Sequence, residues 1–262
     1  MRKPLIKKHI LLLFLILGIT LATSCQSSIK ASVYLSGADM RYENGRYEDA
    51  IEYYDLVIKL NESLDKAYNG KAKCLEALGE HEKALEYCDK ALEQNDDFAD
   101  AYNTKGDALS SLNRFEESLE NYMKAFELEP KKSLYANNIA YAYNSLEKYE
   151  GALEYSEKAI ELNKKNDSAY INKGYALEGL GKFTEALECY NKSLELNPYN
   201  PVCYINKGNL LESLGKSDEA IECFDKALEL DPDDLDTLNS KGDSLNSLGE
   251  FEKAIDCFDQ VL

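Results

Sequence analysis

Residues 171–198 read INKGYALEGLGKFTEALECYNKSLELNP, and residues 205–232 read INKGNLLESLGKSDEAIECFDKALELDP. The two stretches are 34 residues apart, and the same register continues in both directions without insertion or deletion. A fixed period of this length is typical of structural repeats that stack, because one repeat cannot bury its apolar face alone. The sequence therefore predicts one repeat array made of the blocks 31–64, 65–98, 99–132, 133–166, 167–200, 201–234 and 235–262.

Small residues recur where two helices of a block would meet. The eighth residue of every block is alanine or glycine, and the twentieth is alanine or serine, while aromatic residues occupy the fourth and twenty-fourth positions of most blocks. Small side chains at a helix contact let the two axes approach closely, so the pattern predicts a tightly packed helix pair in each block. The fourth block has Ala136 and Ser156 at the aromatic positions and Gly151 in its second helix, and we expect it to be the softest.

The fifteenth position separates the two expected helices. It is glycine in five blocks and Asn113 in the third, and both residue types enter the left-handed conformation that ends a helix. Proline stops the second helix at Pro130, Pro198 and Pro232, since it cannot continue a helix across a block boundary.

The 34-residue period, with Leu-Gly, tyrosine, alanine, phenylalanine and proline at fixed places, resembles the tetratricopeptide repeat. The resemblance covers residues 31–262. It implies an all-α fold, a right-handed α-solenoid of seven helix-turn-helix repeats, and a non-catalytic scaffold for protein–protein interaction. It also implies that the first helices line a concave face and that a protein or an extended peptide binds there.

The positions that contact ligands in this family carry many amides here. The expected partner-binding residues are Asn137, Asn138, Asn172, Asn206, Asn209, Tyr141, Tyr175, Ile171 and Ile205, with Asn144 and Asn246 adding further amides. An asparagine offers a donor and an acceptor together and so matches a peptide backbone whatever its sequence. Asparagine is also simply a soluble residue of helix surfaces. Because amides and tyrosines suit sugars as well, a carbohydrate-binding or cell-wall-processing accessory protein is the alternative function.

Charge and residue types restrict the other classes of function. The chain has a net charge of −18, which argues against binding to nucleic acid because an acidic surface repels phosphates. Its sequence offers no Ser/His/Asp arrangement, no metal-spaced Cys/His pair and no Gly-rich cofactor loop. We therefore expect no enzyme activity, no cofactor and no metal. Lys66 and Lys73 are basic residues of one block, and the next two blocks carry no basic residue at the positions that contact ligands in this family, so an acidic chaperone C-terminus is not expected as the ligand.

The first 24 residues differ from the repeats. Four basic residues precede an apolar run from Ile10 to about Ala22, which is typical of an export signal and shorter than the roughly 20 residues of a membrane-spanning helix. The sequence LATSC resembles a bacterial lipobox, although Ala22 stands where the family usually has leucine. The prediction is a signal peptide over residues 1–24, a lipidated Cys25 with a short tether over residues 25–30, and attachment to the extracytoplasmic face of a bacterial-type membrane in the cell envelope. Ordinary secretion is the alternative.

Two features of the remaining chain lead to further expectations. The six cysteines after Cys25 are expected to be buried free thiols, with Cys74 and Cys88 as the pair to check for a disulfide. The last block stops at Leu262, six residues short of a full repeat and without a polar capping helix. Terminal repeats normally need such a cap, so we expect either a homodimer through the last helix or a chain that has been cut short.

Overall fold

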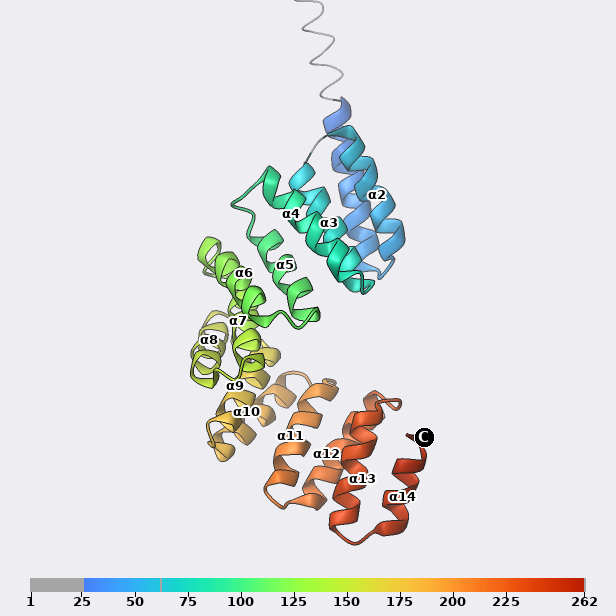
Figure 1. The fold of residues 1–262 in the computed structure, drawn as a ribbon, viewed down its shortest axis with the longest axis vertical. Helices are drawn as coiled ribbons and strands as arrows, with labels where there is room; N and C mark the ends of the chain where they lie inside the picture. The colour runs from blue at the N-terminus through green and yellow to red at the C-terminus, as the bar shows by residue number, and fades with distance from the viewer. Residues whose placement is uncertain (1–25, 62, 262) are drawn as a thin grey trace, which may run out of the picture. The chain divides into compact units, whose positions relative to one another are not determined.

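The computed structural model describes residues 26–61 and 63–261, and every one of its regular elements is an α-helix (Figure 1). The expected signal peptide and Cys25 lie outside these residues. The chain forms two compact units, which we call unit 1 (up to Leu128) and unit 2 (from Glu129). None of the described helices is long and apolar enough to cross a membrane.

Unit 1 begins with a helix whose described part covers residues 26–43, so the expected tether residues 26–30 are helical and continuous with the first repeat. Five further helices follow, each packed against the one before it: α2 (Tyr47–Leu60), α3 (Leu64–Ala77), α4 (His81–Gln94), α5 (Ala99–Ser111) and α6 (Phe115–Leu128).

Unit 2 contains eight helices that also pack in chain order: α7 (Ser133–Ser145), α8 (Tyr149–Leu162), α9 (Asp167–Gly179), α10 (Phe183–Leu196), α11 (Pro201–Ser213), α12 (Ser217–Leu230), α13 (Leu235–Ser247) and α14 (Phe251–Asp259). Helices α5, α7, α9, α11 and α13 begin at the first residue of a block. The stacked helix pairs of both units confirm the predicted all-α solenoid fold.

Glycine at the eighth position of a block makes room for the aromatic ring at the twenty-fourth. A Cβ atom on Gly208 would lie 2.6 Å from the ring of Phe224, which is itself completely buried. The same relation holds for Gly106 with Tyr122, Gly174 with Tyr190 and Gly242 with Phe258. The aromatic ring therefore fills the space that the missing Cβ leaves between the two helices of a repeat.

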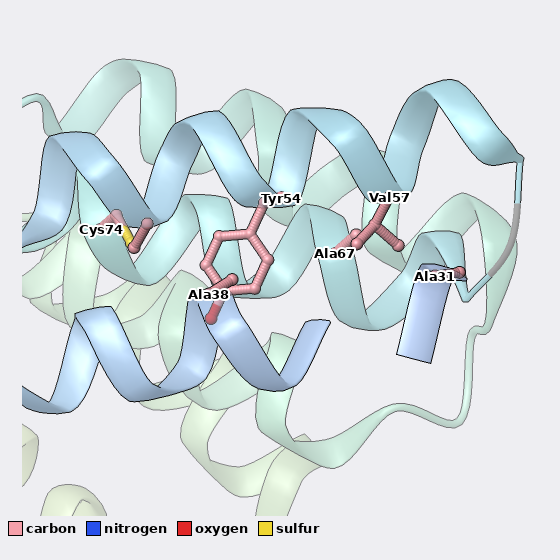
Figure 2. Packing of buried hydrophobic residues seen from close by; sticks show 7 residues of the cluster. Ala31, Ala38, Tyr54, Val57, Ala67 and Cys74 are labelled. Atoms are coloured by element: carbon pink, nitrogen blue, oxygen red, sulfur yellow. The ribbon is translucent and has the colours of Figure 1, made fainter. Parts of the chain in front are cut away.

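Blocks with alanine at the eighth position solve the same packing problem differently. Ala72 and Ala140 occur with the smaller Cys88 and Ser156 at the twenty-fourth position, and all four residues are buried. In the first block, Figure 2 shows the ring of Tyr54 in the buried cluster with Ala38. That ring extends toward the next repeat, where a Cβ on Gly70 would lie 2.3 Å from it.

The fourth block replaces its missing aromatic residues with neighbouring tyrosines. Tyr135 is completely buried one residue before Ala136, and the ring of Tyr143 lies 3.1 Å from the position that a Cβ on Gly151 would take. Gly151 thus accommodates a ring from the first helix. These contacts supply packing at the place where the sequence suggested softness.

An ion pair of one kind recurs at four of the junctions between successive repeats. In each pair, the Nζ of a lysine at the seventh position of a block donates to a carboxylate at the twenty-fifth position of the block before it. The pairs are Lys71 with Asp55 at 2.7 Å, Lys105 with Asp89 at 2.6 Å, Lys173 with Glu157 at 2.8 Å and Lys241 with Asp225 at 2.6 Å. Such partly exposed pairs each contribute about 0.2–1 kcal/mol, so their main effect is to favour one stacking register.

All six described cysteines are free, and five of them are buried. Burial raises the pKa of the Cys74 and Cys88 thiols to about 12, so neither forms much thiolate at neutral pH. The prediction of buried free thiols is confirmed for these five. Cys189 is partly exposed, and Cys74 and Cys88 do not pair.

The last helix, α14, exposes part of its apolar surface. Phe251 is 62% exposed and Ile255 56%, while Ala254 and Cys257 pack inward beside Leu245. Self-association through this helix stays a prediction.

One turn departs from the glycine rule. The fifteenth position of the fourth block is Glu147, with a φ of +56°, whereas the equivalent Gly181 and Gly215 have φ values of +74° and +73°. A residue with a Cβ pays about 1–2 kcal/mol in this left-handed conformation, so the turn between α7 and α8 is strained.

Glu147→Gly should therefore raise the free energy of unfolding by about 0.5–1 kcal/mol, the relief of strain less the entropy that glycine adds to the unfolded chain. Glu150→Gly, at an exposed site inside α8, is the matched control and should destabilise by up to about 1 kcal/mol. Thermal unfolding followed by circular dichroism measures both. Loss of stability in both variants would contradict the strain.

Candidate functional site

The first helices of three consecutive repeats in unit 2 enclose a pocket of about 290 Å³. Its lining residues, which we call the unit 2 pocket, are Tyr141, Asn144 and Ser145 from α7, Ile171, Asn172 and Tyr175 from α9, and Val202 and Asn206 from α11. On each helix these residues are spaced by one, three or four positions and so share one face. All eight side chains are uncharged.

Side-chain amides connect α7 to α9 at this pocket. The Nδ2 of Asn172 donates to the Oδ1 of Asn137 at 3.0 Å and to its backbone oxygen at 3.3 Å. The Nδ2 of Asn144 donates to the backbone oxygen of Asn172 at 3.0 Å. This amide bridge fixes the positions of Asn144 and Asn172 before any ligand arrives.

The bridge leaves one acceptor unsatisfied. Asn144 is only 6% exposed, and its Oδ1 has no hydrogen-bond partner among the described residues. A buried polar atom without a partner costs about 1–3 kcal/mol. This oxygen has almost no accessible surface, so an N–H donor in the pocket would remove that penalty only after the Asn144 side chain turned toward it.

Apolar side chains stand open beside the amides. Tyr141, Tyr175 and Val202 are 46%, 44% and 53% exposed, although each is large enough to favour burial. The ring of Tyr149 packs against that of Tyr175 with 6.4 Å between centroids. The pocket therefore combines apolar contact area with amide groups that can pair with a polar backbone.

Family models described as tetratricopeptide repeat match residues 35–100, 99–132, 134–165, 168–200, 201–234 and 223–256. The chain belongs to the tetratricopeptide repeat family. The unit 2 pocket thus lies on the first helices of three successive tetratricopeptide repeats.

Several solved tetratricopeptide repeat structures resemble the chain. YrrB, described as having an unusual peptide-binding site, is 26% identical, with a TM-score of 0.53 over 72% of this chain and 97% of its own. TTC0263 from Thermus thermophilus is 23% identical, with a TM-score of 0.62 over 69% of this chain and 98% of its own. A protein from Parabacteroides merdae is 16% identical, with a TM-score of 0.71 over 88% and 92%. The last two show the fold alone, and no curated protein matches the chain significantly.

The structure brings five of the nine expected binding residues together. Tyr141, Tyr175, Ile171, Asn172 and Asn206 line the unit 2 pocket. The other four are not among its lining residues. Asn137 accepts a hydrogen bond from the lining residue Asn172, and Asn138, Asn209 and Ile205 lie elsewhere on the first helices.

Two lining residues, Ser145 and Val202, were missed at the sequence level. They occupy the thirteenth and second positions of their tetratricopeptide repeats, which are contact positions of the family, but neither is an amide or an aromatic residue. Reading those positions as closely as the fifth, sixth and ninth would have found them.

Unit 1 holds a cavity of different chemistry. It measures about 380 Å³ and is lined by charged residues, including Asp39, Glu43, Lys66 and Lys73. The hydroxyl of Tyr54 donates to Asp39 at 2.7 Å. This charged cavity of unit 1 therefore differs in chemistry from the uncharged unit 2 pocket.

The remaining chemical groups do not assemble a catalytic or metal site in the described ranges. No group of three or more His, Cys, Asp or Glu residues there is arranged to hold a metal ion. His81 is the one histidine within residues 26–261 and the first residue of α4. Its Nδ1 lies 3.6 Å from the Oε1 of Glu76. It occupies the position that aromatic residues fill in most other tetratricopeptide repeats.

Proposed function

We propose that this protein is a non-catalytic interaction scaffold that binds an extended segment of a protein partner in the unit 2 pocket. The observation that carries the proposal is the buried Oδ1 of Asn144, which has no donor and lies beside exposed apolar side chains. A peptide supplies both missing components, a backbone N–H and a side chain to cover the apolar surface.

The free polar groups of the pocket suit a peptide backbone. The side chain of Asn206 makes no hydrogen bond with another described residue, so both its donor and its acceptor are available. Asn144 adds an acceptor once its side chain turns this buried oxygen toward the pocket. An amide that pairs with both groups of a peptide unit reads the backbone and not the sequence. Tyr141, Tyr175, Ile171 and Val202 would contact one apolar side chain of the bound segment.

Tetratricopeptide repeats in general act as protein-interaction scaffolds, and the similar YrrB structure is described as having a peptide-binding site. Both facts support the proposal.

The test is capture of random short peptides by the protein from residue 26 onward. Asn206→Ala should weaken capture by about tenfold, the effect of losing a paired hydrogen bond of about 1.4 kcal/mol. The matched control is the exposed triple variant Glu154→Ala, Glu188→Ala and Glu222→Ala on the second helices, which should bind as the parent does. Equal losses in both would show that binding occurs elsewhere, and capture of glycans but not peptides would favour the carbohydrate alternative.

We further propose that the protein is exported and anchored by lipid on Cys25, on the extracytoplasmic face of a bacterial-type membrane. The basic residues and apolar run that precede LATSC support this proposal. Because residues 26–30 are helical, they extend only about 7–8 Å at 1.5 Å per residue, which would hold the first repeat close to the membrane.

Cys25→Ala should abolish fatty-acid labelling and leave the unprocessed precursor in the membrane fraction, since the acyl acceptor is removed. Labelling of wild type and variant with a radioactive fatty acid measures this. Unchanged labelling would exclude the anchor, and normal cleavage without labelling in both proteins would indicate ordinary secretion.

A further inference from the structure

The unit 2 pocket has a counterpart one repeat further along the chain. Moving each lining residue by 34 positions gives Tyr175, Glu178, Gly179, Ile205, Asn206, Asn209, Asp236 and Ser240 on α9, α11 and α13. Tyr175 and Asn206 belong to both sets, so the two sets are contiguous. We call the second set the adjoining site.

Two residue differences give the adjoining site a different chemistry from the unit 2 pocket. Glu178 stands at the position of Asn144, and Asp236 stands at the position of Val202. The uncharged pocket is therefore followed by a site that has two carboxylates and, among its eight positions, no basic residue.

The chain does not neutralise these carboxylates itself. Glu178 is half-buried, and its Oε2 accepts from the hydroxyl of Tyr190 at 3.0 Å, but it forms no ion pair with a described basic residue. Burial raises the pKa of Glu178, and the hydrogen bond from Tyr190 offsets only part of this rise. Asp236 likewise forms no ion pair with a described residue; its backbone N–H donates to Asp234.

The nearby lysines point elsewhere. Lys173 on α9 pairs with Glu157, and Lys241 on α13 pairs with Asp225. Lys207 on α11 occupies the same seventh position and lines a different cavity beside Glu222 and Asp225. A cation for the adjoining site therefore has to come from a ligand.

Asp236 also lies in the first turn of α13, where the helix dipole stabilises a negative charge. The equivalent residues of α7, α9 and α11 are Leu134, Ser168 and Val202, so the fold does not require an acid at this position.

We propose that the bound segment carries an apolar or aromatic residue for the unit 2 pocket and a lysine or arginine for the adjoining site. This inference rests on the proposed function. Packed helices lie about 8–10 Å apart, and an extended chain advances about 3.3–3.6 Å per residue. The basic residue should thus stand about three residues from the apolar one, on the side that faces α13.

The experiment uses the peptides that the wild-type protein captures from a random library. Lysine or arginine should be enriched about three residues from an apolar residue. Glu178→Gln with Asp236→Asn should weaken binding of such peptides by about tenfold and reduce its dependence on salt, because salt screens charge pairs. The glutamine side chain can still accept from Tyr190, so the fold is preserved.

Two controls make the result specific. Glu188→Gln with Glu222→Gln makes the same change in net charge on the second helices and should leave affinity unchanged. A peptide in which the basic residue is replaced by glutamine should bind wild type and the Glu178/Asp236 variant equally well.

No enrichment of basic residues, or full affinity of the Glu178/Asp236 variant for basic peptides, would overturn the inference. If neutral peptides still bind in a manner that depends on Asn206, the proposed function stands alone. If no peptide binds, both fall.

Discussion

Phe224→Ala should lower the free energy of unfolding of unit 2 by about 3–5 kcal/mol, the usual effect of removing a buried aromatic ring. Phe224 has no exposed surface, and its ring fills the space above Gly208 between α11 and α12. The neighbouring helices are held by further repeats on either side, so they cannot collapse onto the cavity. Urea unfolding followed by circular dichroism measures the loss.

The effect should depend on Gly208. Gly208→Ala alone places a Cβ 2.6 Å from the ring and should destabilise by about 1–3 kcal/mol, as overpacking does. In the Phe224→Ala background the same exchange should be neutral or stabilising, because Ala140 already occurs with the small Ser156. Additive losses in the double variant would refute the packing relation. Phe251→Ala, at a site that is 62% exposed, is the control and should change stability little.

Tyr141→Ala with Tyr175→Ala should weaken peptide capture by at least about 100-fold, since buried aromatic contacts at interfaces are each worth about 2 kcal/mol or more. In the free protein both rings are nearly half exposed. Their removal should therefore change stability much less than it changes binding. Fluorescence anisotropy with captured peptides measures affinity, and thermal unfolding checks the fold.

Tyr199→Ala provides the matched control for this pair. Tyr199 is 77% exposed and lies between α10 and α11, outside the unit 2 pocket. Affinity should be unchanged in this variant. Parent-like affinity in the double tyrosine variant would show that the pocket is not the binding surface.

The repeat period made most of the fold predictable. Every second helix, from α2 to α14, begins at the seventeenth position of its block, because the residue at the fifteenth position ends the first helix in a left-handed turn. The eighth and twenty-fourth positions were assigned to the core from sequence alone. Only the contacts showed that a glycine at the eighth position makes room for the aromatic ring at the twenty-fourth. They also showed that Ala72 and Ala140 occur with the smaller Cys88 and Ser156.

The candidate site was predictable only in part. The spacing of Tyr141, Asn172 and Tyr175 placed them on the first helices, but helical spacing does not say which amide is used within the protein. Asn137 appeared equivalent to its neighbours and instead accepts the hydrogen bond of Asn172.

Compensation by nearby residues was also hidden from sequence analysis. Tyr143 packs on Gly151, and Glu147 adopts the left-handed backbone conformation that glycine takes in other repeats. Such substitutions follow no repeat pattern, since they depend on which side chain happens to reach the space.

The ion pair between the seventh position of one repeat and the twenty-fifth of the repeat before it affects how such an array can grow. A repeat with a lysine at the seventh position and an acid at the twenty-fifth supplies one partner to each of its two junctions, so a duplicated copy of such a repeat brings one partner for each of two ion pairs. At the junction of the fifth and sixth repeats, Asn191 occupies the position of the acid that would pair with Lys207, so this junction lacks the ion pair. A second copy of residues 201–234 inserted directly after the first would place its lysine opposite Asp225. Tandem duplication would thus create at the new junction the bond that the original one lacks, which makes this repeat a favourable unit for lengthening the array.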